Sequence, residues 1–463
     1  MQPTLASSAP TEVGFTSPLI RYYQGVRAAA RQVVRERDGA PSPTVSFDLP
    51  PLDERLRRYF DQPGVTLAPI GAERGRSLWM LNLMGDPETR TTKTLASLVM
   101  VARAAHHIDR TGEGVLIVTP SSANKATALR AAVGRAYRTG LATPEQLRIV
   151  AVAPATSAAK LRAGDLSADA HLRAANPFVL ADVDHPANVK QLAREAVDMC
   201  AAEILAGTGF RTWYSLDIDN YRIADSVRAF VEAETMPLTR ASRPRLHAHA
   251  VSSAYGLLGY HLGWRLLSSG AYADLATPAS HPGFFLVQQL ATPDMVLSLR
   301  YGDTSHSRIP EYRRDGDHWR QSADPAFPAV TDDPHEVLDR TFYTTNPPTC
   351  SQIDQIVARH GGGGVVVSRR ECLDRYDCVR QLCAEAGVRL PSDPADIREW
   401  SIVKALTGIL VGIERGFIAE GTDVVVHGSG FYTDALLPPL PEEHVRRLSR
   451  ATELAAVMRT AAS

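Results

Sequence analysis

The chain has 463 residues, a formal net charge of −1 and an apolar fraction of 44%. These values suit a globular protein with room for two packed domains, and they give no overall attraction to nucleic acid or to an anionic membrane. No segment reaches the run of about 18 apolar residues that a membrane-spanning helix needs, and the first residues lack the basic start and apolar core of a secretory signal. We therefore expect a soluble, cytoplasmic protein.

The numbers of cysteines and lysines further limit the kinds of site that the chain can form. The five cysteines are odd in number and include no C-x-x-C pair, which argues against a disulfide framework or a zinc ribbon, and we predict no metal site. Lysine is scarce, so a reaction that needs an amine has few candidates. The lysines are Lys93, Lys125, Lys160, Lys190 and Lys404.

The first 50 residues are rich in Pro, Ser and Ala around one basic helical segment, which indicates an arm or small subdomain rather than a core strand. From Leu78 onward, short apolar runs alternate with longer helical patterns. The alternating segments are LASLVMVARAAHHID, VLIVT, ATALRAAVGRAY, LRIVAVA and VKQLAREAVDMCAAEIL. Strands that alternate with helices of this length predict an α/β fold, with parallel sheets covered by helices.

The middle of the chain is less regular. Residues 279–348 mix apolar runs with a polar, arginine-rich segment that is typical of an insertion or an active-site lid. Before it, His247 and His249 lie on one face of a predicted strand, where a buried or cofactor-lining role is favoured over a metal site. After it, HGGGG at 360–364 follows a helical pattern and precedes VVVS, which favours a helix stop over a phosphate loop.

Three short loops follow predicted secondary structure at places where ligands collect in parallel sheets. They are residues 121–125 after VLIVT, 206–212 in AGTGFRT, and 427–430 in HGSG after VVV. Each loop has a structural alternative: a helix N-cap for the first, a helix C-cap and turn for the second, and a hairpin turn for the third.

Lys93 lies between the loop DPETRTT and a helix with a predicted apolar face. Burial of that face and the positive end of the helix dipole would both lower the pKa of the amine, which makes it a better nucleophile. The alternative is a solvated lysine at a helix start, which is the commoner situation.

In this order the segments resemble the fold type II pyridoxal-phosphate enzymes, the tryptophan synthase β-like group, and within it threonine synthase. DPETRTTK resembles the family segment N-P-T-G-S-F-K, and SSAN resembles S-S-G-N. AGTGFRTWYSL resembles the phosphate-binding glycine loop, while EWSIVKALTGIL and VVVHGSGFYTD resemble the two C-terminal family segments. The resemblance covers about residues 80–240 and 350–435.

The resemblance implies a role for each matching residue. Lys93 would bind pyridoxal phosphate covalently and then act as the base that moves the substrate Cα proton. Asn124 would hydrogen-bond the 3-hydroxyl of the cofactor ring, and Glu399 would lie near the ring. Ser429, or His427 in the place of a family threonine, would face the pyridine nitrogen.

The resemblance also implies two binding loops. Hydroxyl and N–H groups would bind the substrate carboxylate from Ser121, Ser122 and Ala123. Backbone N–H groups would bind the cofactor phosphate from Gly207, Thr208, Gly209, Phe210 and Arg211. Lys125 would pair with a substrate anion or, as an alternative, replace Lys93 as the cofactor-binding lysine.

The implied architecture has two α/β domains. A small substrate-binding domain would cover residues 95–195, and a large cofactor-binding domain would cover 51–94 and 196–463 with an insertion at about 279–348. Residues 1–50 would form the N-terminal arm. A homodimer is a possible assembly, because members of the family are often dimers.

The implied activity is elimination or replacement at the β or γ carbon of an amino acid. Ala123, Thr94 and Trp400 stand where the family has glycine, aspartate and proline, so we expect a divergent member with a specialised biosynthetic role. Two alternatives stay open. One is a serine/threonine dehydratase or a cysteine synthase-like β-replacement enzyme, and the other is a non-catalytic relative that binds an amino acid or anion.

Overall fold

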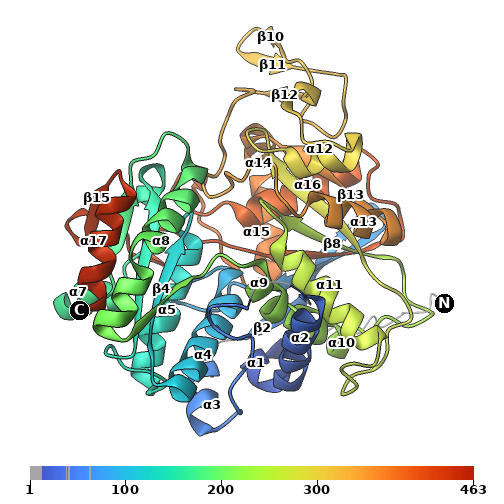
Figure 1. Cartoon of the computed structure of the whole chain (residues 1–463). Coiled ribbons are helices and arrows are strands. Elements are labelled where there is room, and N and C mark those ends of the chain that lie inside the picture. Colours follow the sequence, from blue (N-terminus) through green and yellow to red (C-terminus); the bar gives the residue numbers. More distant parts are fainter. Residues whose placement is uncertain (1–12, 38, 40–41, 62–63) are drawn as a thin grey trace.

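The computed structural model describes residues 13–37, 39, 42–61 and 64–463. The described chain forms two main sheets with helices packed around them (Figure 1). The larger sheet has seven strands. In spatial order they are β1 (Val13–Phe15), β2 (Val65–Glu73), β3 (Arg76–Asn82), β14 (Asp423–Gly428), β8 (Arg245–Ala250), β9 (Gly283–Gln289) and β13 (Gly362–Val367). From β3 to β13 all neighbours are parallel, whereas β1 and β2 add an antiparallel edge.

The smaller sheet has five parallel strands. In spatial order they are β15 (Val445–Leu448), β6 (Phe178–Ala181), β5 (Leu147–Pro154), β4 (Gly114–Pro120) and β7 (Phe210–Tyr214). The central strands are almost wholly buried, as expected for apolar runs between helical layers. The α/β class predicted from the alternating pattern is therefore confirmed.

The boundaries of the small sheet differ from the prediction. Residues 95–195 supply only β4, β5 and β6, while β7 and β15 come from outside that range. The reason is non-local pairing: β15 lies beside β6, and the C-terminal helix α17 (Ala451–Ala462) packs on α8 (Val189–Thr208) through apolar side chains such as Leu454 and Cys200. Local sequence periodicity does not reveal such pairing between distant segments.

The N-terminal segment joins the main core, and, contrary to the prediction, it also supplies a strand of the large sheet, β1. It contains α1 (Pro18–Arg21) and α2 (Tyr23–Glu36), followed by α3 (Glu54–Phe60). The buried face of α2 includes Val26, Ala29 and Val33, and the helix packs against α9 (Ile218–Asp225) and α11 (Tyr255–Ser268). The expected arm is thus a packed part of the protein, and residues 1–12 lie outside the described residues.

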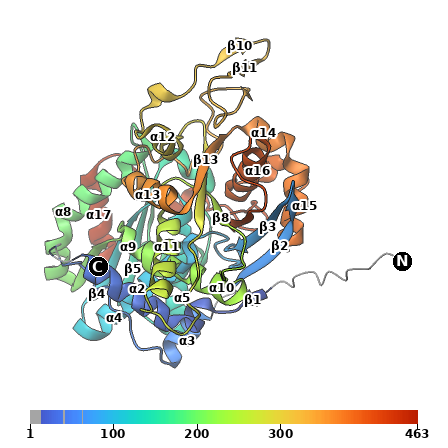
Figure 2. The same cartoon turned by 90° about the vertical axis from the view of Figure 1, so that its right-hand side faces the viewer.

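The predicted insertion begins later than residue 279. The segment Gly283–Gln289 is the fully buried strand β9, and α12 (Asp294–Tyr301) follows it. Only then does the chain form a small three-stranded sheet, which projects beyond the main body (Figures 1 and 2). Its strands are β10 (Arg313–Asp315), β11 (His318–Arg320) and β12 (Val330–Thr331).

The remaining helices complete the layers around the two sheets. Around the small sheet lie α4 (Lys93–Thr111), α5 (Asn124–Thr139), α6 (Asp165–Ala168) and α7 (Ala170–Ala175). Around the large sheet lie α10 (Val227–Thr235), α13 (Cys350–His360), α14 (Arg369–Asp374), α15 (Tyr376–Glu385) and α16 (Ser401–Glu414). Within the described ranges, no helix is both long enough and apolar enough to cross a bilayer.

Candidate active site

A cavity lies where strands from both sheets end. Residues at or just after the carboxyl ends of β4, β8 and β14 line it: Pro120, Ala250 and Ser429. The first turns of four helices also reach it, through Lys93, Asn124, Tyr255 and Ser401. Carboxyl ends of parallel strands and helix N-termini present free N–H groups, so this cavity is the natural ligand site of the fold.

Lys93 is the first residue of α4, and the loop before it is bonded to the loop after β14. The Thr92 N–H donates to the carbonyl of Ser429 at 3.0 Å, and the Phe431 N–H donates to the carbonyl of Arg90 at 3.4 Å. These backbone bonds hold Lys93 and Ser429 on the same wall of the cavity.

The amine of Lys93 is enclosed by protein, although its side chain keeps some surface toward the cavity. Its Nζ donates to Thr92 Oγ1 at 3.2 Å. Burial lowers the pKa of Lys93; the Asp225 carboxylate opposes that shift, and the Arg228 guanidinium adds to it. The group is therefore a cavity-facing amine with raised nucleophilicity.

Ser429 and His427 were the two candidates predicted to face the pyridine nitrogen of the cofactor, and the structure places them differently. Ser429 lines the cavity, and its Oγ is buried with no hydrogen-bond partner within the described protein. The ring of His427 lies deeper, with Nε2 at 2.8 Å from His247 Nδ1 and Nδ1 at 3.1 Å from an Arg228 nitrogen. A buried hydroxyl without a partner calls for a ligand atom, so Ser429 fits the role better.

Asn124 and Glu399 form a direct pair. The Asn124 side-chain amide donates to Glu399 Oε2 at 2.6 Å, and the Tyr432 hydroxyl donates to Asn124 Oδ1 at 3.0 Å. Asn124 lines the cavity, whereas Glu399 is fully buried behind it. Glu399 thus orients Asn124 and does not itself form the cavity wall.

Behind Asn124 lies a buried ion cluster. Lys160, at the end of the 3-10 helix Ala155–Lys160, donates to Asp339 at 2.6 Å and to Glu399 at 2.8 Å. Burial alone would lower the pKa of Lys160, but the two carboxylates outweigh it and raise that pKa. The Lys160 ammonium group therefore bridges the two carboxyl groups, which fixes the turn before α16 against the small sheet.

The loop before α5 shows both a structural and a site role. Ser121 Oγ accepts hydrogen bonds from the N–H groups of Ala123 and Ala126, at 3.1 and 3.0 Å, so its hydroxyl caps the helix. Ala123 has φ +119, a conformation that favours glycine. Ser122 and Asn124 line the cavity directly, whereas fully buried Ala123 supports the turn.

The predicted phosphate loop at 207–211 is wrong. Gly207 and Thr208 are the last residues of α8, and Gly209 ends the helix at φ +74 with its N–H bonded to the Leu205 carbonyl. Phe210 starts β7, and Arg211 pairs with Glu113.

The position of this segment excludes the predicted role. Phe210 pairs with Gly114 at the start of β4, whereas the cavity lies at Pro120, the end of that strand. Six residues of extended strand span about 20 Å. The glycines therefore serve as a helix C-cap, which was the structural alternative.

The loop that does lie at the cavity is a different one, and sequence analysis missed it. The cavity is lined by residues 251–256, which form the turn after β8 and the first two residues of α11, with Ala254 at φ +51. A Cβ at Gly256 would lie 2.7 Å from a guanidinium nitrogen of Arg228, so a larger residue here would displace the guanidinium group. A helix N-terminus beside a guanidinium group is a site for an anion such as a phosphate. The signal in the sequence was a strand followed by VSSAYG and an apolar helix.

The scarce lysines gather at this site. Lys93, Lys125 and Lys190 line the cavity, while Lys160 and Lys404 lie behind it. The Lys125 amine donates to the carbonyl and hydroxyl of Ser215 at 3.2 and 3.1 Å, and burial lowers its pKa to about 7. Burial likewise lowers the pKa of Lys190 and, for Lys404, brings it to about 8.

The segment that returns from the projecting sheet also reaches the cavity. Residues 341–344 line one wall, and the Thr344 N–H donates to Ser252 Oγ at 3.4 Å. The Thr349 hydroxyl donates to the Ser253 carbonyl at 2.7 Å. The end of the predicted insertion is therefore part of the site and is bonded to the 251–256 loop.

The fold is similar to that of the fold type II pyridoxal-phosphate enzymes. Threonine synthase from yeast matches with a TM-score of 0.51 and 10% identity, covering 95% of this chain and 89% of the yeast protein. Threonine synthase from Brucella melitensis, solved with PLP bound, matches with a TM-score of 0.50 and 12% identity, covering 98% of this chain and 92% of that one. Identities this low establish the fold alone.

The chain belongs to a family of unknown function, DUF6002, whose model matches residues 14–462. No curated protein matches the sequence.

Proposed function

We propose that this protein binds pyridoxal phosphate through Lys93 and catalyses elimination or replacement at the β or γ carbon of an amino acid. One observation carries the proposal. A low-pKa amine, an unpaired buried hydroxyl and a helix N-terminal turn share one cavity, through Lys93, Ser429 and residues 251–256.

These three features match the three ends of the cofactor. The Lys93 amine suits its aldehyde, the Ser429 hydroxyl suits its pyridine nitrogen, and the 251–256 turn with Arg228 suits its phosphate. Pyridoxal phosphate supplies, when bound, an electron sink for charge that develops at the substrate Cα.

Lys93 also has the properties of the proton carrier. Its lowered pKa favours the uncharged form of the amine, which is the form that accepts a proton. Asn124 is held by Glu399 and Tyr432, so its amide keeps one orientation beside the ring position. A fixed orientation reduces the entropy that binding would otherwise lose.

The opposite wall suits an amino-acid substrate with an acidic or activated side chain. Ser122 and the first turn of α5 offer hydrogen-bond donors to a carboxylate, and Lys125 and Lys190 line the same cavity. An anionic leaving group would be stabilised by these amines as its charge develops.

The test uses the full chain mixed with pyridoxal phosphate. We expect a visible absorbance band that Lys93→Ala abolishes and Lys125→Ala retains. We also expect release or exchange of the side-chain group from O-activated serine or O-activated homoserine, and the preferred one assigns β or γ chemistry. A colourless protein that still binds amino acids would contradict the enzyme and indicate a binding module.

A further inference from the structure

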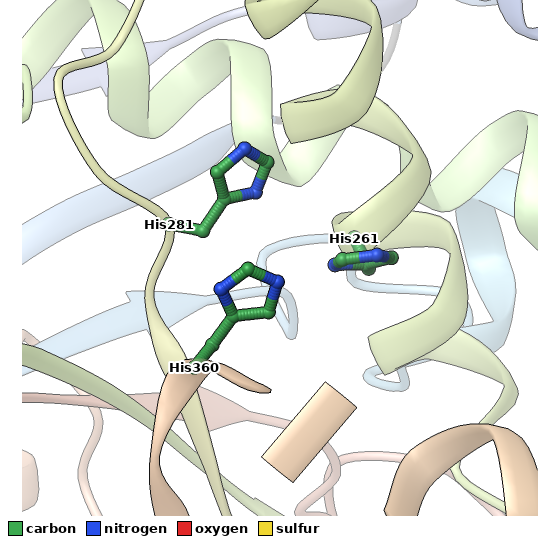
Figure 3. Close-up of side chains that lie close together, drawn as sticks. All are labelled: His261, His281 and His360. Carbon is green, nitrogen blue, oxygen red and sulfur yellow. The ribbon is translucent and has the colours of Figure 1, made fainter. Parts of the chain in front are cut away.

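Three histidines that are far apart in the chain converge at a second place. His261 lies on α11, His281 precedes β9, and His360 is the last residue of α13. One ring nitrogen from each lies within 4.8 Å of the others. Figure 3 shows the three rings facing a common space, with His281 and His360 on one side and His261 on the other.

The sheet register explains this convergence. Strand β9 runs parallel to β13, with Phe284 opposite Gly362, so the residues just before the two strands are neighbours. His281 and His360 occupy those positions, and their rings stack at 4.9 Å between centroids. Helix α11 places the His261 ring 5.7 Å from His360. The cluster is thus at the amino ends of the strands, opposite to the Lys93 cavity.

His281 is already oriented as a ligand. Its Nε2 lies 2.9 Å from the hydroxyl of Ser268, while its Nδ1 is buried with no hydrogen-bond partner in the described chain. Ligating histidines are commonly fixed in this way through the second ring nitrogen.

We propose that His261, His281 and His360 form a binding site for a divalent transition-metal ion of the zinc type. Imidazole nitrogens suit zinc, copper and nickel, and three such ligands leave a fourth position open. Zinc–nitrogen bonds of about 2.0 Å place tetrahedral nitrogens about 3.3 Å apart, so small rotations of the rings would close the site.

The surroundings favour an anion in the fourth position. Arg265 and Arg359 line the hollow next to the three rings, and Arg265 is paired with Glu36 at 2.9 Å. The positive charge of Arg359 opposes a bare dication, and a hydroxide or chloride bound to the metal offsets it. The metal connects α11, the start of β9 and the end of α13, so its role is structural: it stabilises the packing of these elements.

The test titrates Zn²⁺ into the full-length protein after chelator treatment. We expect one equivalent to bind, with affinity lowered tenfold or more by His281→Gln or His360→Gln. His171→Gln, which changes an exposed histidine on α7, is the matched control and should leave the affinity unchanged. Bound Zn²⁺ should raise the unfolding temperature of the wild type and the control but not of the cluster variants.

If the cluster variants fail to fold, a second measurement tests the proposed metal site. Co²⁺ added to the wild-type protein should give the intense visible absorption of a four-coordinate site with nitrogen ligands. The weak spectrum of six-coordinate aqueous Co²⁺ would overturn the proposal. Equal Zn²⁺ affinity in a folded His281→Gln/His360→Gln variant would also overturn it, as would inorganic phosphate binding at these residues without any Zn²⁺ binding.

Discussion

The side-chain amide of Asn124 donates a 2.6 Å hydrogen bond to the buried carboxylate of Glu399, 275 residues later in the chain. This bond joins the first turn of α5 to the turn before α16, and so connects the two sheets directly behind the cavity. Because Lys160 also bonds to Glu399, the pair belongs to a network that includes a buried ion pair.

Glu399→Gln should therefore destabilise the fold as well as weaken the site. Removing one partner of a buried ion pair costs about 3 kcal/mol or more, and Lys160 would keep only Asp339. The measurement is the free energy of unfolding in urea. Glu88→Gln, which breaks an exposed pair with Arg138, should cost less than about 1 kcal/mol. Equal losses in the two variants would argue against the network.

Ser429→Ala should separate cofactor binding from stability. The hydroxyl has no partner within the described protein, so its loss should leave the free energy of unfolding nearly unchanged. The loss of one hydrogen bond to the cofactor should weaken pyridoxal phosphate binding by about tenfold. Thr212→Val removes another unpaired buried hydroxyl, in β7, and should not change cofactor affinity. Unchanged affinity in Ser429→Ala would contradict the assigned contact.

Gly256→Ala should weaken phosphate binding, because the new methyl group would displace the Arg228 guanidinium from the 251–256 turn. Gly207→Ala is the matched control: no atom lies near its Cβ position, and the change in a helix should stabilise the protein by about 0.5–1 kcal/mol. Cofactor affinity, measured by titration, should fall in the first variant and stay the same in the second. The opposite pattern would restore 207–211 as the phosphate loop.

Lys125 should give the stability a pH dependence. Burial lowers its pKa from 10.5 to about 7, so the unfolded chain binds more protons between these values. The free energy of unfolding should consequently rise with pH from about 7 to about 10, by up to about 1.4 kcal/mol per unit. Lys125→Met should lack this pH dependence, so the difference in free energy of unfolding between the wild type and the variant should shrink as pH rises. Parallel curves would show that the amine is not desolvated.

The sequence predicted the elements that depend on local periodicity. The strand–loop–helix pattern around Asn124 and the strand before Ser429 are present in the structure, as is the helix that starts at Lys93. The α/β class follows from the same pattern and is confirmed.

Other features depended on contacts that periodicity does not encode. Gly207 and Gly209 led to the prediction of a phosphate-binding loop, yet they lie at the end of a helix. The 251–256 segment, which does line the cavity, contains a single glycine, Gly256. β15 joins the small sheet from the far end of the chain. The histidine cluster arises from the register of β9 and β13, which no spacing of His281 and His360 could reveal.

The most direct measurement of the central proposal is the identity of the lysine that bonds to the cofactor. The protein is mixed with pyridoxal phosphate, reduced with borohydride, digested and mapped by mass spectrometry. We expect the label on Lys93, which lies on the same cavity wall as Ser429. A label on Lys125, Lys160, Lys190 or Lys404 instead, or no label at saturating cofactor, would contradict it.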